Sequence, residues 1–483
     1  MNNMNSGTKG DIIIIDAFST GKTLAKFLKQ YGHNLIHIKS SPALPSRFQH
    51  NPEDFSENLE YTGDINNIEQ ILTKYKKIIM CVPGSESGVE LADLLSERLG
   101  LPTNGTEFSK ARRNKFEMID KVAAAGIPTV KHYKANNVED IIEWWDKELK
   151  EDRIVLKPLE SASGDNVFFC HNRKEIIAAF EIIIKDQNLF GEQNIEVLAE
   201  SFNQGCEYIV NTVSSHGFHI VTEIWRINKK PGTLIYDTAE IVHENEEEFE
   251  KLFNYAKQVL DALHIQYGAC TTELKYTKQD GPKLIETGAR MMGAAPVTFS
   301  NELAGCSQVS LMADAYLSLD KEEFMACVAT RKHNKKFYGM AVILISYVLG
   351  TLTDDLDTSD IEKLKTYHSK AIAVKKGDSL PITVDSLTAP GEIYLFSTEK
   401  EELLEDYRAL RDIEANKLYV SALRHNNENS LQNSIMSYSN KKTIYLGFFR
   451  PSSSQLVVNG FFANIPLMFT APSALLAIRP RLK

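Results

Sequence analysis

Strands and helices alternate over the first hundred residues, and this alternation constrains the fold more than any other feature of the sequence. Apolar segments such as "DIIIID" and "KIIMCVPG" have the length and β-branched content of buried strands, and amphipathic stretches such as 21–31 separate them. The helix predicted over "GVELADLLSERLG" ends at Gly100, with Pro102 just beyond, which is the usual chemistry of a helix stop. The pattern therefore predicts a doubly wound α/β domain with a parallel sheet over residues 1–105.

The tripeptide Gly21-Lys22-Thr23 follows the first predicted strand, where a phosphate-binding loop would lie. Such a loop has a further glycine five residues before Gly21, but this sequence has Asp16 there, and its carboxylate would repel phosphate. The dinucleotide pattern Gly-x-Gly-x-x-Gly fails as well, because Asp16 and Phe18 hold its first two glycine positions. We therefore interpret this segment as the first unit of a Rossmann-like supporting domain and not as a nucleotide site.

The pattern changes beyond residue 105. Two amphipathic helices are followed by strand-like segments, which helices at 172–188 and 245–263 interrupt, and this order predicts an antiparallel α+β body. Further short strands and a helix at 399–413 predict a smaller α+β domain, and an Asn/Ser-rich stretch predicts a linker. The predicted divisions are a domain at 106–325, with a small lobe at about 125–200 and a body at about 201–325, a C-terminal α+β domain at 326–424, and a linker and tail at 425–483.

The bulk composition excludes several classes of protein. A net charge of -10 argues against nucleic-acid binding through a general positive field. The six cysteines are scattered without a Cys-x-x-Cys pair, so neither a zinc site nor a disulfide framework is indicated. The N-terminus lacks a signal-peptide apolar core, and the longest apolar run, 339–350, is too short to span a bilayer. We expect a cytoplasmic protein without nucleic-acid or membrane partners.

A lysine and a loop of small residues lie together in "RIVLKPLESASGDNV". Lys157 ends a predicted strand, and the stretch with Ser161, Ser163 and Gly164 precedes the next one. Small residues let backbone N–H groups approach an anion closely, and the hydroxyl groups add donors. The arrangement suits a triphosphate, although an ordinary polar hairpin would have the same composition.

Two glutamates flank a turn in "VLAESFNQGCEYIVN". Glu200 ends one apolar strand, and Glu207 begins the next. The backbone of Ser201 and Phe202 could face a flat base, and the Glu207 carboxylate could accept hydrogen bonds from ribose hydroxyl groups. Surface acids beside a turn are the alternative interpretation.

The strongest candidate site lies in "YGACTTELKYTKQDGPKLIETGARMMGAAP". Glu273 and Glu286 occur on two strands that the turn at 280–282 joins, so a hairpin can bring them side by side. Adjacent carboxylates repel unless a cation lies between them, and Mg²⁺ takes oxygen ligands from one or two carboxylates and from phosphates. Arg290 follows in a glycine-containing stretch and can hold phosphate with its forked guanidinium. A plain salt bridge is the alternative for any single pair.

Together these segments resemble the ATP-grasp superfamily over roughly residues 10–420. The resemblance implies a Rossmann-like domain, an ATP-grasp fold of two α+β lobes with ATP between them, and a small C-terminal α+β domain. It places the first ATP-binding lysine of the fold on Lys115, in "ARRNKFEMIDKVAAAGIP", and the second on Lys157. The other implied roles are the phosphate-covering loop at 160–166, the adenine hinge at Glu200, Ser201 and Phe202, the ribose acid Glu207, the magnesium carboxylates Glu273 and Glu286, and Arg290, which steadies an acyl phosphate.

One departure from the common pattern narrows the branch of the superfamily. Many relatives read Glu-x-Asn-x-Arg on the last metal strand, whereas Gly288 holds the asparagine position here. The string "IETGARMMG" is similar to the branch of L-amino acid (dipeptide) ligases. In that branch the segment "YDTAEIVHE" would contribute to the amino-acid pocket, which makes Glu240 and His243 candidate substrate-binding residues. A surface acid and a hydrogen-bonded polar histidine are the alternative.

The resemblance implies an ATP-dependent carboxylate–amine ligase that uses Mg²⁺ or Mn²⁺. A substrate carboxylate attacks ATP to give an acyl phosphate and ADP, and an amine then displaces phosphate. The expected partners are small carboxylates and amines, amino acids among them, with a homodimer left open. The alternatives are a biotin-carboxylase-like or purine-biosynthetic ligase, which the absent asparagine disfavours, and a non-catalytic nucleotide-binding module, which the retained lysines, carboxylates and Arg290 disfavour.

Overall fold

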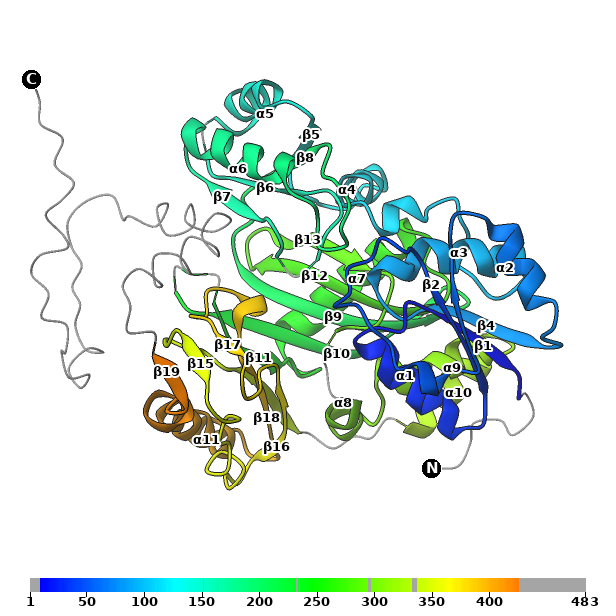
Figure 1. Cartoon of the computed structure of the whole chain (residues 1–483). Helices are drawn as coiled ribbons and strands as arrows, with labels where there is room; N and C mark the ends of the chain where they lie inside the picture. The colour runs from blue at the N-terminus through cyan, green and yellow to red at the C-terminus, as the bar shows by residue number, and fades with distance from the viewer. Residues whose placement is uncertain are drawn as a thin grey trace, which may run out of the picture.

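The computed structural model describes residues 9–150, 152–162, 164–231, 233, 235–293, 297–331 and 337–424. Over these residues the chain forms four β-sheets with helices packed on them, a mixture of α/β and α+β architecture (Figure 1). Ser163 and the predicted linker and tail at 425–483 lie outside the described residues. No helix in the described ranges combines the length and apolar character that crossing a bilayer requires.

The first sheet is parallel, as the alternating pattern predicts. Its strands follow the order β3-β2-β1-β4, with bounds β1 Asp11–Ile15, β2 Asn34–Lys39, β3 Glu57–Glu60 and β4 Ile78–Pro83. Ile12 and Ile14 of β1 pack in one apolar cluster with α1 (Thr20–Gln30). Ile13 and Ile15 pack in another with α2 (Ile65–Leu72) and α3 (Val89–Arg98). Both faces are thus covered, which explains why β1 is a continuous run of isoleucine.

The second sheet is a small antiparallel sheet with the order β5-β8-β6-β7. Its strands are β5 His132–Ala135, β6 Ile154–Pro158, β7 Phe168–Cys170 and β8 Val197–Ser201. The helices α5 (Val138–Trp144) and α6 (Arg173–Lys185) bury Ile141 and Ile176 against one face. This sheet and its helices form the small lobe at the top of Figure 1, and α4 (Lys115–Ala124) lies between it and the larger sheet below.

The largest sheet has eight strands in the order β13-β12-β9-β10-β11-β14-β18-β16. Its strands are β9 Cys206–Ser215, β10 Phe218–Lys229, β11 Tyr236–Ile241, β12 Gly268–Thr277, β13 Gly281–Gly288, β14 Tyr338–Ile343, β16 Tyr367–Ile372 and β18 Gly391–Ser397. The helix α7 (Glu247–Ala262) packs on one face through residues such as Leu252 and Val259. The helices α8 (Val297–Ala304), α9 (Gln308–Leu317) and α10 (Lys321–Arg331) follow β13.

The eight-stranded sheet continues through the border that we predicted between residues 325 and 326. Strands β14, β16 and β18 come from the predicted C-terminal domain but extend the sheet of the body. The same region also forms a separate small sheet of β15 (Gly350–Leu352), β17 (Ser379–Leu380) and β19 (Ala422–Arg424), which packs with α11 (Lys400–Ile413). The division of the chain into domains stays a prediction, and the region 326–424 is structurally joined to the body.

Arg112 ties the parallel sheet to the body. Its side chain is fully buried, and Nη1 donates to Asp93 Oδ2 on α3 at 2.7 Å and to the Gly105 carbonyl at 2.9 Å. Nε donates to the Leu263 carbonyl, just after α7, at 3.0 Å. Burial raises the pKa of Asp93, and the Arg112 guanidinium and the Ser109 hydroxyl partly offset this increase. The Arg112 guanidinium therefore links α3, the loop at Gly105 and the end of α7.

Replacing this cation tests how much the junction contributes to stability. We expect Arg112→Met to cost about 3–5 kcal/mol of folding free energy, because it leaves Asp93 buried without its cation. Arg98→Met is the matched control, since it breaks the exposed Arg98–Glu69 pair of 2.6 Å, and solvent screening should make its effect on stability far smaller. Chemical denaturation measures both, and equal losses would contradict the role given to Arg112.

Candidate active site

The predicted glutamate pair is present on the β12–β13 hairpin. Glu273 lies directly opposite Glu286 in the antiparallel register, and both side chains are partly exposed. Directly opposed residues of an antiparallel pair have Cβ atoms about 5 Å apart. The turn lies at 278–280, two residues before the predicted position at 280–282, because Gly281 and Pro282 already pair in β13. The hairpin still brings the two carboxylates together as the sequence predicts.

The two carboxylates have opposite pKa shifts. Burial raises the pKa of Glu273, and the charges of Glu286 and Glu207 add to the effect. Burial would also raise the pKa of Glu286, but the ammonium group of Lys115, with Lys157 and Arg290, holds it below its ordinary value. The pair thus favours one ionised and one protonated carboxyl group until a further cation arrives.

This donor set fits Mg²⁺ or Mn²⁺ that is bound together with a phosphate. In the described ranges no group of three or more His, Cys, Asp or Glu side chains forms a complete metal cage. Mg²⁺ does not need one, because it is commonly held by one or two carboxylates with phosphate oxygens and water. Glu273 and Glu286 are the residues that would hold it.

The two predicted ATP lysines reach the same region. Lys115, the first residue of α4, places Nζ 2.8 Å from Glu286 Oε2 and donates to the Ser161 carbonyl at 2.6 Å. Lys157 ends β6, and its Nζ lies 2.8 Å from Glu200 Oε1 on β8. Both ammonium groups are nearly buried, where their charge is weakly screened. They form a positive region next to the glutamate pair.

The loop after β6 connects these lysines. Ser161 Oγ donates to Asp165 Oδ2 at 2.9 Å and accepts from the Leu189 N–H at 3.2 Å, so this hydroxyl is used inside the loop. Gly164 has a φ of +71° and open space around the position of a Cβ atom. A glycine suits this left-handed turn, and the loop can approach a ligand closely.

The predicted adenine and ribose residues are engaged with other protein groups. The N–H groups of Ser201 and Phe202 donate to the carbonyls of Lys131 and Arg153 at 2.8 and 3.1 Å. Glu207 accepts from Lys229 Nζ at 2.8 Å and from the Tyr236 hydroxyl at 3.3 Å. A nucleotide at Glu207 would have to replace these contacts.

Arg290 has a partner that the sequence analysis missed. Its Nε donates to Glu86 Oε2 at 2.9 Å, and Glu86 Oε1 lies 3.3 Å from Arg113 Nη1. Glu86 stands 204 residues earlier, in the turn after β4. Ligand sites of parallel sheets gather beyond the carboxyl ends of the strands, so an acid at the end of β4 was a usable signal.

Gly288 leaves room for this ion pair. A Cβ atom at residue 288 would lie 2.8 Å from Glu86 Oε2 and 3.3 Å from the Arg290 guanidinium carbon. The space that a side chain at residue 288 would need is therefore taken here by the carboxylate of Glu86.

Gly21, Lys22 and Thr23 lie in the first turn of α1 and do not form a phosphate loop with free N–H donors at Gly21 and Lys22. The N–H groups of Gly21 and Lys22 already donate to the carbonyls of Phe18 and Ser19. A Cβ atom at Gly21 would lie 2.7 Å from the Gly84 carbonyl oxygen, so the helix start is packed on β4. Thr20 Oγ1 donates to the Met292 carbonyl at 2.6 Å, which fixes the segment just after Arg290.

Glu240 and His243 lie elsewhere, which differs from the sequence-based expectation. Residues that stand opposite one another across the strands form rows, and Glu240 shares a row with Arg226 of β10. Glu273 stands opposite Ile209 of β9, which stands opposite Trp225 of β10, so Glu273 is in the adjacent row. Adjacent rows point to opposite faces of a sheet, so Glu240 faces away from the glutamate pair.

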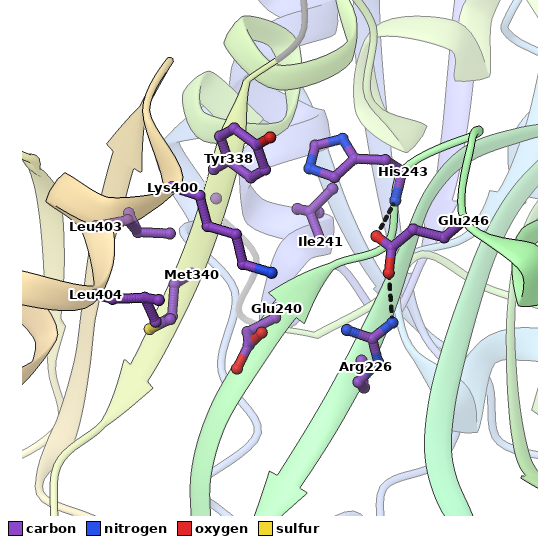
Figure 2. Close-up of a pocket in the computed structure, with 11 residues that line it drawn as sticks. Arg226, Glu240, Ile241, His243, Glu246, Tyr338, Met340, Lys400, Leu403 and Leu404 are labelled. Carbon is purple, nitrogen blue, oxygen red and sulfur yellow. Dashed lines mark hydrogen bonds and ion pairs between the residues drawn. The ribbon is translucent and has the colours of Figure 1, made fainter.

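Figure 2 shows both residues in a cavity of about 30 Å³. Arg226 and Glu246 line it from the body, and Lys400, Leu403 and Leu404 line it from α11. Glu240 thus lies on the opposite face of the sheet from the glutamate pair, and a substrate-binding role for Glu240 and His243 stays a prediction.

Comparisons with known proteins place this geometry in a family. No protein-family model matches the chain. The chain is 32% identical over 415 residues to dapdiamide A synthase of Enterobacter agglomerans, a match that covers 84% of this chain and 96% of that protein. It is 27% identical over 237 residues to alanine–anticapsin ligase of Bacillus subtilis (strain 168), covering 45% and 49% of the two chains.

A solved structure has the same fold. The crystal structure of an L-amino acid ligase from Bacillus licheniformis superposes with a TM-score of 0.66 at 19% identity, over 84% of this chain and 98% of that one. The near-complete match to the synthase and the placement of both lysines beside the glutamate pair lead to one conclusion. The chain belongs to the ATP-grasp superfamily, in the branch of the L-amino acid ligases, and it is an ATP-dependent ligase that forms carbon–nitrogen bonds.

Proposed function

We propose that the enzyme joins the carboxylate of one L-amino acid to the amine of a second, while ATP is converted to ADP and phosphate. The observation that carries the proposal is the convergence of Lys115, Lys157 and Arg290 on the Glu273–Glu286 pair. Relatives named for dapdiamide A synthesis and for alanine–anticapsin ligation support amino-acid substrates.

The chain's own residues position the reactants and offset charge. A donor carboxylate oxygen attacks the γ-phosphorus of ATP, the bond to the β-phosphate oxygen breaks, and ADP leaves. The acceptor amine attacks the acyl carbon, phosphate leaves with the electrons of the carbon–oxygen bond, and the amine loses its proton. Lys115, Lys157 and Arg290 offset the charge on the transferring group, and no side chain acts as a nucleophile. Mg²⁺ or Mn²⁺ at Glu273 and Glu286 would supply Lewis-acid polarisation of phosphate oxygens.

ATP lies between the small lobe and the eight-stranded sheet in this proposal. The loop with Ser161, Ser163 and Gly164 covers the phosphates, the segment 200–202 contacts adenine, and Glu207 accepts from the ribose. The ion pair of Lys157 with Glu200, and that of Lys229 with Glu207, exchange partners when the nucleotide binds. The β1–β4 sheet is the Rossmann-like support of the substrate side, and the enzyme acts in the cytoplasm.

The first test is a substrate screen with a metal-site variant. Release of ADP and phosphate is measured over the standard amino acids, singly and in pairs, and at least one pair should give both products. Glu286→Gln should lower turnover by more than about 100-fold because it removes a metal oxygen ligand. Asp280→Asn, in the exposed turn of the same hairpin, is the control. Absence of ADP with every pair would refute the proposal, and full activity of Glu286→Gln would refute the metal assignment.

The second test separates the two candidate phosphate sites. Lys157→Ala should weaken ATP binding by about 10- to 100-fold in calorimetry, because a nearly buried cation that faces the phosphates is lost. Lys22→Ala should leave ATP affinity unchanged, since the Gly21-Lys22-Thr23 turn has no role in nucleotide binding. The reverse result would restore the phosphate-loop interpretation of that turn.

The third test concerns Arg290 and the acid that positions it. Arg290→Ala should lower kcat on the order of 10³-fold with little change in ATP affinity, as expected for a cation that acts in the transition state. Glu86→Gln should lower kcat by about 10-fold in the same manner, because it weakens the anchor of the guanidinium. Glu53→Gln, an exposed acid of the same domain, is the control. Losses of ATP affinity equal to those of kcat would assign Arg290 a simple binding role.

A further inference from the structure

A buried polar cluster lies on the face of the large sheet that carries the glutamate pair. Asn211 on β9 stands directly opposite Glu223 on β10, and its Nδ2 donates to Glu223 Oε1 at 2.9 Å. Glu223 is 7% exposed, Asn211 is fully buried, and Trp225 follows on the same face. None of these residues takes part in the mechanism given above.

Three polar atoms of this cluster make no hydrogen bond within the described part of the chain: Glu223 Oε2, Asn211 Oδ1 and Trp225 Nε1. Burial raises the pKa of Glu223, and the polar side chains of Thr222, Asn211, Trp225 and Ser300 near its carboxyl group oppose this shift. The Trp225 and Ser300 side chains are thus close to the carboxyl group, but Trp225 Nε1 and Glu223 Oε2 do not meet the geometry of a hydrogen bond. A buried polar atom without a partner costs about 1–3 kcal/mol, so three in one place indicate that a polar group normally completes the cluster.

The cluster lies close to the catalytic residues. Asn211 pairs with Thr271, which is two residues before Glu273 and points to the same face. Asn211 Nδ2 also contacts the sulfur of Met292, two residues after Arg290. Glu223 is two strands from β12, which corresponds to about 10 Å at the usual strand spacing. A phosphoryl group and a substrate carboxylate would occupy this interval.

We propose that Glu223, Asn211 and Trp225 form the subsite for the α-ammonium group of the donor amino acid. Two free acceptor atoms, one of them on a carboxylate, suit an ammonium group, and the Trp225 N–H can donate to an oxygen of the same molecule. The amine of the acceptor amino acid must be neutral to attack, so an anion that stabilises its ammonium form would slow the reaction. The amino group of the donor does not react and can stay an ammonium group. A buried carboxylate therefore suits the donor. This inference rests on the proposed function and assigns Glu223, in place of Glu240, to the amino-acid pocket.

Glu223→Gln tests the subsite with little change in shape. The glutamine can still accept from Asn211, but its second terminal atom becomes a donor and repels an ammonium group. The readout is kcat/KM for ADP formation with the donor found in the screen and with the same acid lacking its amino group. We expect the variant to lose on the order of 100-fold with the amino acid and little with the desamino acid. Affinity for ATP should not change.

Two further variants keep the test decisive. Glu414→Gln changes an equally buried carboxyl group beside α11, and it should leave the discrimination between the two acids intact. Glu223→Asp retains the charge but shortens the side chain by one methylene, so it should raise KM for the amino acid and not for the desamino acid. If Glu223→Gln does not fold, Glu223→Asp takes its place in the test.

The possible failures are distinguishable. If the unaltered enzyme forms no ADP with any amino acid, both the proposed function and the proposed subsite are refuted. If the enzyme is active and the Glu223 variants keep their preference for the amino acid, the subsite alone is overturned, and the cluster holds a structural water molecule. Equal losses with both acids would also overturn it, because they would show a general effect on the active site.

Discussion

Two carboxylates held side by side on neighbouring strands cannot both stay charged without cations, and much of this structure serves to supply those cations. Glu273 and Glu286 are fixed by the hairpin register, which leaves them no freedom to separate. Lys115 contacts Glu286 from the start of α4, and Lys157 and Arg290 add to the positive potential. The groups that relieve the repulsion are of the kind that the proposed triphosphate and its metal would need, so the arrangement suits preorganised binding of these ligands.

The parallel sheet contributes to this arrangement although it carries neither Lys115 nor Lys157. Glu86, just beyond β4, holds Arg290, and Thr20, at the start of α1, holds the backbone of Met292. Arg112 then joins α3 to the end of α7 through fully buried hydrogen bonds. Arg290 is therefore positioned by a part of the chain that lies far away in sequence, and buried hydrogen bonds hold that part on the body.

Local patterns predicted most of the elements and the central pair of the site. The apolar runs indicated the strands, and a turn between them, predicted at 280–282 and found at 278–280, was enough to predict Glu273 beside Glu286. Long-range pairing was not predictable, because nothing local links Glu86 to Arg290 or places β14 in the sheet of the body. The face of Glu240 also could not be predicted, since a shift of one residue in register reverses the direction of every side chain on a strand.

The contact between Gly288 and Glu86 restricts how a sequence like this one can change. An asparagine at residue 288 would collide with the carboxylate of Glu86, and that carboxylate is also the anchor of Arg290. The Glu86 carboxylate is the flexible end of its side chain, so it could move aside for a larger residue 288, but it would then leave its 2.9 Å contact with Arg290. Residues 86, 288 and 290 therefore share one space although they come from separate parts of the fold, and substitutions at these positions are expected to be non-additive.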